Sequence, residues 1–119
     1  MILILVWTGN PSAGSSATMD GIWQLWLEYQ GHRITACLEI RQQEQEFAGL
    51  VKKASASRLF GFFDGSFEGL EITVDLNRFG AIEPATGTLD AAFSSARGQW
   101  KSSDQNDHQW ELRRVSACY

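Results

Sequence analysis

The chain has 119 residues, 44% of them hydrophobic, and a formal net charge of −4. This is the length of a single domain, because smaller pieces could not bury a core, and the composition excludes a wholly disordered chain. The acidic balance, without any basic run, argues against nucleic acid and anionic membrane surfaces as partners, since both attract Lys and Arg.

Residues 1–18 are predicted to be an N-terminal extension or linker, and residues 19–119 a single β-barrel domain. The first seven residues, MILILVW, are apolar but far fewer than the roughly 20 needed to span a bilayer, and they lack the positive start of a signal peptide. An extra β-strand, or a natural start at Met19, would also explain them. Residues 8–18 are rich in Gly, Ser and Pro, which is typical of a linker.

From residue 21 onward, apolar and polar residues alternate in short runs separated by turn residues, which predicts strands joined by hairpins. The expected strands cover residues 21–29, 32–42, 47–51, 59–67, 70–76, 86–93, 97–101 and 109–115. No segment has the three-and-four spacing of an amphipathic helix. The predicted fold is therefore all-β, an antiparallel up-and-down barrel of about eight strands, because closure removes the exposed sheet edges.

The first and last of these strands resemble the calycin pattern shared by lipocalins and avidins. Gly21-Ile22-Trp23 opens the first strand, and Arg113-Arg114 lie in the last. The resemblance implies a lipocalin- or avidin-like barrel with a Trp at its floor and a basic side chain packed across that ring. It also implies a ligand cavity that opens at the opposite end. No set of biotin-contacting residues can be matched, so the resemblance assigns no ligand.

Seven side chains form the candidate ligand-binding set, on the expectation that they face the barrel interior. Three tryptophans lie on the apolar phase of strands that meet when the barrel closes, and they could line a pocket for a flat or apolar molecule. Alternatively, they simply fill a narrow barrel. Tyr29 offers a hydroxyl, while Arg114 fits a structural role over the ring of Trp23 better than a ligand contact. The set is Trp23, Leu25, Tyr29, Phe60, Trp100, Trp110 and Arg114.

Bulky side chains on the opposite phase predict a contact surface. The residues expected to point outward are Ile22, Trp26, Leu59, Phe63 and Phe67. Exposed rings at this density favour a homo-oligomer, most simply a symmetric dimer. If the phase of residues 59–67 is the reverse, their phenylalanines belong to the core instead.

The chain has two cysteines, Cys37 and Cys118, too few to indicate a disulfide-rich fold. We expect a buried thiol and a free tail thiol, and a bridge only if the last residues fold back beside the strand that carries Cys37. The chain is expected to be soluble, with the cytoplasm favoured over secretion.

The sequence carries no catalytic signature and predicts no cofactor. His32 and His108 lie beside turns without a matched third ligand, so no metal site is expected. The carboxylates of Asp64, Asp75 and Asp90 are expected on solvated outer faces, and no serine has a recognisable base and acid. These features favour non-enzymatic binding of a small apolar or aromatic molecule in the barrel interior. The alternative is a protein-interaction or homo-oligomerisation module with a solid core.

Overall fold

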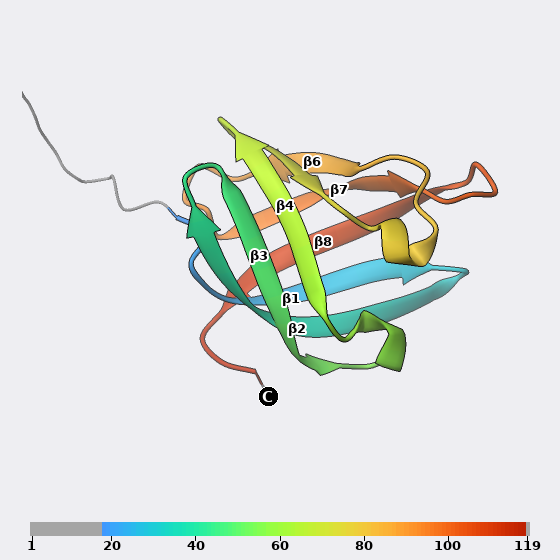
Figure 1. Ribbon diagram of the computed structural model, residues 1–119, viewed down its shortest axis with the longest axis horizontal. Helices are drawn as coiled ribbons and strands as arrows, with labels where there is room; N and C mark the ends of the chain where they lie inside the picture. Colours follow the sequence, from blue (N-terminus) through green and yellow to red (C-terminus); the bar gives the residue numbers. More distant parts are fainter. Residues whose placement is uncertain (1–17, 119) are drawn as a thin grey trace, which may run out of the picture.

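Eight antiparallel strands close into one barrel in the computed structural model, which describes residues 18–118 (Figure 1). The strands are β1 (Gly21–Tyr29), β2 (His32–Gln43), β3 (Glu46–Ala54), β4 (Phe62–Glu68), β5 (Glu71–Val74), β6 (Ala85–Leu89), β7 (Ser95–Lys101) and β8 (Asp107–Val115). Each strand pairs with the next in the sequence, and β8 pairs with β1, where Leu112 lies opposite Leu25. The predicted all-β up-and-down barrel is confirmed. Residues 1–17 of the predicted extension lie outside the described residues.

Two short 3-10 helices interrupt the meander. One, η1 (Ser57–Leu59), joins β3 to β4, and the other, η2 (Asn77–Phe79), joins β5 to β6. Each contributes one buried apolar side chain, Leu59 from η1 and Phe79 from η2. Both helices lie at the right in Figure 1, at the end of the barrel where β1 turns into β2. None of the helices in the described part of the chain is long and apolar enough to cross a membrane.

A pair of facing glycines allows β6 and β7 to coil tightly. Gly87 lies opposite Gly98, and a Cβ atom at Gly98 would collide with the backbone carbonyl of Thr86. On the other side of Gly98, Trp110 of β8 lies opposite it in the register. The ring of Trp110 would be 2.6 Å from a Cβ atom added at Gly87. The indole thus fills the space that two side chains would otherwise need, and the glycines supply the curvature of a narrow barrel.

The predicted phase of residues 59–67 was wrong. Phe63 is only 3% exposed, whereas Phe62 is 62% exposed. Rings occur on both phases of this segment, so alternation alone could not choose between them. The register decides, because Phe63 lies opposite Gly49 on the inward phase of β3, where the missing side chain leaves room for a ring. The reverse phase, stated above as the alternative, is the correct one, with Leu59 fully buried and Phe67 packed against the core.

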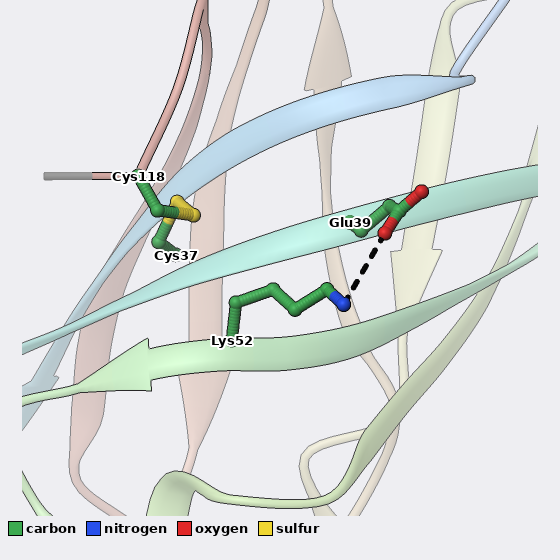
Figure 2. Close-up of a disulfide and its surroundings, with 4 residues drawn as sticks. All are labelled: Cys37, Glu39, Lys52 and Cys118. Carbon is green, nitrogen blue, oxygen red and sulfur yellow. Dashed lines mark ion pairs between the residues drawn. A yellow bond between two sulfur atoms is a disulfide. The ribbon is translucent and has the colours of Figure 1, made fainter.

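Cys37 and Cys118 form a disulfide, so the expectation of two free thiols was wrong (Figure 2). The residues after β8 turn back to the outer side of β2, which was the condition for a bridge. Because β1 lies between β8 and β2, the disulfide spans the seam at which the barrel closes. Cys37 points away from the interior but is only 3% exposed. The two cysteines are 81 residues apart in the sequence.

Candidate functional site

Trp23 closes one end of the barrel interior. Its ring is fully buried, and its indole N–H donates a hydrogen bond to the carbonyl oxygen of Met19 at 2.8 Å. The guanidinium of Arg114 lies 4.5 Å from the ring centroid, the contact that the calycin resemblance implies. Arg114 donates hydrogen bonds to the backbone carbonyls of Thr18, Asp20 and Phe93. Four of the five N–H donors of this guanidinium are used within the protein, which fits a structural role.

The interior between the two ends is filled by side chains. Leu25 and Trp110 help to line a residual cavity of about 10 Å³. A cavity of this size holds one water molecule at most. The other lining residues, all apolar, are Leu38, Ile40, Phe47, Phe63, Val74, Leu76 and Leu112. The described barrel therefore offers no preformed interior space for a small organic molecule.

The tryptophans of the candidate set also have their polar atoms paired within the protein. The indole N–H of Trp100 donates to the carbonyl of Glu28, and that of Trp110 to the carbonyl of Thr86, each at 3.2 Å. With the bond from Trp23 to Met19, all three indoles donate to backbone carbonyls. The geometry supports the alternative in which these rings fill a narrow barrel.

Stacked rings close the opposite end, and we call Tyr29, Phe63, Phe79 and Trp100 the aromatic plug. Tyr29 stacks on Trp100 with 5.9 Å between ring centroids and meets Phe79 edge-on at 5.8 Å. Phe79 stacks on Phe63 at 6.1 Å. The structure thus brings together the predicted pair Tyr29 and Trp100, at the end where the resemblance places a ligand entrance. Phe79 was missed, because it lies outside all of the expected strands.

Two arginines hold the 3-10 helices against this plug. Arg78 of η2 donates a hydrogen bond to the carbonyl oxygen of Phe60 at 2.7 Å, and its guanidinium lies 5.1 Å from the ring centroid of Phe63. Arg58 of η1 lies over the ring of Tyr29 at 5.1 Å. The bond from Arg78 ties η2 to the segment that follows η1, so the two helices cover the plug together.

A polar cluster next to the plug was also missed by the sequence analysis. The hydroxyl of Ser102 hydrogen-bonds to the carboxylate of Asp104 and lies 3.0 Å from Nε2 of His108, whose ring is 4.7 Å from that of Trp100. The Ser102 bond is the largest cause of a lowered pKa for Asp104. A carboxylate can only accept, so the hydroxyl of Ser102 donates to Asp104, and its oxygen faces Nε2 of His108. The cluster thus links the turn between β7 and β8 to the ring that lies beside Trp100.

Phe60 does not join the other candidate residues. Its side chain is 51% exposed, and it lies between η1 and β4 on the outside of the barrel. Its inclusion depended on the wrong phase of residues 59–67, so the expectation that it faces the interior is corrected. Leu50 and Phe62 lie opposite each other on β3 and β4, and Phe60 precedes Phe62 by two residues; we call these three exposed side chains the outer apolar patch. The predicted outward side chains of Ile22 and Trp26 are half-buried on the outer face of β1.

No family model and no curated protein matches the chain. Among solved structures, it is similar to a redesigned beta barrel, with a TM-score of 0.55 and 12% identity, covering 82% of this chain and 92% of that one. It is also similar to a de novo designed fluorescence-activating beta barrel, with a TM-score of 0.50 and 16% identity, covering 81% of this chain and 93% of the design. Similarity at such low identity shows the barrel fold and does not extend to the calycin family.

Proposed function

We propose that the barrel binds a small, flat, largely apolar molecule at the aromatic plug. The observation that carries this proposal is the stack of Tyr29 on Trp100 at the end opposite Trp23. The mouths of β-barrels are common ligand sites, and flat rings are the natural partners of stacked aromatic side chains. The similarity to a fluorescence-activating designed barrel supports the proposal at the level of the fold only. The calycin resemblance, with Arg114 over Trp23 as a fixed floor, supports the same orientation.

Because the interior is filled, a ligand must take the place of side chains that the 3-10 helices contribute. Leu59 and Phe79 are the buried residues of these helices, and no barrel strand carries them. Outward movement of η2 would break the hydrogen bond from Arg78 and free the apolar space that Phe79 occupies. The ligand would then bury its surface against Trp100, at about 25 cal/mol for each Å². Because only open molecules bind, the apparent affinity equals the affinity of the open form multiplied by the fraction of molecules that are open.

Tryptophan emission tests this proposal, because Trp100 lies in the plug and Trp26 on the outer face. The probes are N-phenyl-1-naphthylamine and Nile red, titrated into the wild-type chain and into Trp100→Phe and Trp26→Phe variants. We expect saturable quenching that is lost in Trp100→Phe and kept in Trp26→Phe. Unchanged emission with every probe, in the wild-type chain and in an Arg78→Ala variant with a loosened plug, would defeat the proposal.

Self-association is a second candidate function, and the filled core favours it. The barrel formed by residues 18–118 is closed and leaves no long strand edge to extend, so two copies of it would meet through side-chain faces. The outer apolar patch supplies such a face, with Phe62 62% and Phe60 51% exposed. A two-fold axis would place the patch of one copy against the patch of the other.

Sedimentation velocity over a range of concentrations tests this second candidate. A Phe62→Ser variant should dissociate at concentrations where the wild-type chain is dimeric. Leu70→Ser is the matched control, because Leu70 is 40% exposed but lies at the turn after β4. A wild-type chain that stays monomeric at millimolar concentration, or a dimer that Leu70→Ser weakens as much as Phe62→Ser, rules out this interface.

We also infer that the chain matures in an oxidising compartment. Disulfides persist in such compartments and are rare where glutathione and thioredoxin keep thiols reduced. The bridge between Cys37 and Cys118 supports this inference, which departs from the preference for the cytoplasm drawn from the sequence. Thiol counting on the chain purified from its natural source tests it, and two free thiols in the folded protein would overturn it.

A further inference from the structure

Trp26 stands on the outer face of β1 between two guanidinium groups. Arg33 of β2 lies 5.4 Å and Arg113 of β8 5.5 Å from the centroid of the Trp26 ring. Glu111, which is opposite Trp26 in the register, accepts a hydrogen bond from Arg113 at 2.7 Å and lies 3.8 Å from Arg33. Two guanidinium groups are thereby held in place beside one ring, even though the side chains of Arg33 and Arg113 are 64% and 56% exposed.

A groove of about 680 Å³ runs beside this arrangement over the outer faces of β1, β8 and β7. Arg97 of β7 lies opposite Glu111 in the register and adds a third guanidinium to the groove. Gly31 and Gly98 also line it and bring no side chain. The acidic residues that line the groove are Glu28 and Glu111.

The charges of this groove differ in sign from that of the whole chain. Three arginines line it against two glutamates, on a chain with a formal net charge of −4. The carboxylate of Glu28 accepts a hydrogen bond from the backbone N–H of Gln109 at 3.1 Å, and that of Glu111 lies between Arg33 and Arg113. Both carboxylates are engaged within the protein, while the guanidinium groups keep further N–H donors toward solvent.

We propose that this groove binds a small polyanion, a molecule with two or more phosphate or sulfate groups, through Arg33, Arg97 and Arg113. The planar guanidinium fork matches the oxygens of such groups, and stacking on an aromatic ring fixes its orientation before binding. Arg97 on β7 and Arg33 on β2 are three strand spacings apart, about 14 Å along the curved wall of the barrel. The register staggers Arg113 and Arg33 to opposite sides of Trp26. A ligand with separated anionic groups fits this spread of guanidinium groups, whereas a single anion uses only one of them.

This site is independent of the aromatic plug, because its side chains lie on the outside of the barrel. Its contacts are exposed, so binding is expected to weaken strongly with added salt. Trp26 reports on it directly, because an anion bound to the two guanidinium groups beside the ring changes the charge around the indole and therefore its emission.

The experiment titrates inorganic triphosphate and a sulfated heparin tetrasaccharide into the chain at low salt, with calorimetry and tryptophan emission as readouts. The variant is Arg33→Ala/Arg97→Ala. The matched control is Arg41→Ala/Lys52→Ala, which removes the same charge from cations paired with Glu39 on another part of the outer face. We expect the groove variant to bind about tenfold more weakly than the wild-type chain and the control to bind as the wild type does.

The two probes separate the possible sources of the anionic groups. Saturable binding of triphosphate supports a site for phosphate groups, and saturable binding of the tetrasaccharide supports a site for sulfate groups. No binding of either probe at low salt overturns the proposal. An equal loss of affinity in the groove variant and in the control also overturns it, since general attraction to positive charge would then explain the binding. Both double variants are confirmed as folded by circular dichroism before titration.

Discussion

The guanidinium of Arg78 donates its hydrogen bond to the backbone carbonyl of Phe60, and so joins the two segments that cover one end of the barrel. The same group lies over the ring of Phe63 in the plug. Arg78 therefore holds η2 through one hydrogen bond and one cation–π contact. Loss of both contacts would release the segment that carries Phe79 while leaving every strand pair of the barrel intact.

An Arg78→Ala variant is expected to open the plug more often. The lost hydrogen bond and cation–π contact together contribute about 1–2 kcal/mol to the closed form. Hydrogen exchange should accelerate in residues 57–61 and 76–80 and stay unchanged in β1 and β8. Arg97→Ala serves as the control, because it removes an arginine from the outer face. Exchange that is unaltered around η2 would show that Arg78 does not hold the plug closed.

Removal of the disulfide should lower the free energy of unfolding by about 4–5 kcal/mol, given that the cross-link closes a loop of 81 residues in the unfolded chain. Urea unfolding of a Cys37→Ser/Cys118→Ser variant measures this loss. A reducing agent should destabilise the wild-type chain by a similar amount and leave the variant unaffected. Equal stability of the variant and the oxidised wild-type chain would contradict the presence of the bridge.

Gly98→Ala is predicted to destabilise the barrel by about 3 kcal/mol, the upper range for overpacking a core. The added methyl group would collide with the carbonyl of Thr86, which β6 cannot move without losing its pairing with β7. Gly69→Ala is the comparison, because no atom lies within 4 Å of its Cβ position and only its φ of +60° opposes the change. Thermal unfolding should show the larger loss for Gly98→Ala, and the reverse order would contradict the tight coiling.

The turn between β6 and β7 predicts a dependence of stability on pH. The pKa of Asp90 is lowered, first by the hydroxyl of Ser94, then by the backbone N–H of Ser94, with a smaller contribution from that of Ser95. A lowered pKa means that the ionised carboxylate stabilises the folded state above the usual value near 3.8. That stability is lost as the pH falls through the folded-state pKa.

An Asp90→Asn variant should therefore be less stable than the wild-type chain at about pH 7, and the difference should shrink toward about pH 2. Chemical unfolding at both pH values checks this. Asp107→Asn is a suitable comparison, because Asp107 lies beside a different turn, at the start of β8. Its carboxylate forms an ion pair with Lys101 at 3.2 Å. If Asp90→Asn lowers the free energy of unfolding by the same amount at both pH values, the ionised carboxylate of Asp90 does not stabilise the turn.

The barrel could be predicted because period-two alternation and frequent turns act locally, strand by strand. The contact of Arg114 with Trp23 at the floor of the barrel was predicted as well, from the resemblance to the calycin pattern. Both residues lie in the two strands that meet where the barrel closes. The phase of Phe63 could not be settled by alternation, but its partner Gly49 carried a usable signal. A large ring inside a narrow barrel needs a small residue opposite it, and the same holds for Phe47 opposite Gly65.

Contacts between loops were beyond the sequence analysis. The approach of Cys118 to Cys37 depends on the path of three residues after β8, which no periodic pattern specifies. Phe79 reaches the plug from a 3-10 helix, and Ser102 meets His108 across the turn between β7 and β8. Tyr29 and Trp100 were predicted as ligand contacts. The structure stacks them at one end of the barrel, and ligand binding by this pair remains a proposal.

Nuclear magnetic resonance gives the most direct test of ligand binding at the aromatic plug. Titration with N-phenyl-1-naphthylamine should shift the indole N–H signal of Trp100 and the backbone amides of Tyr29 and Phe79, while the indole signal of Trp23 at the floor stays in place. Signals that do not move at saturating probe, or that move only around Phe62 on the outer apolar patch, would contradict binding at the plug.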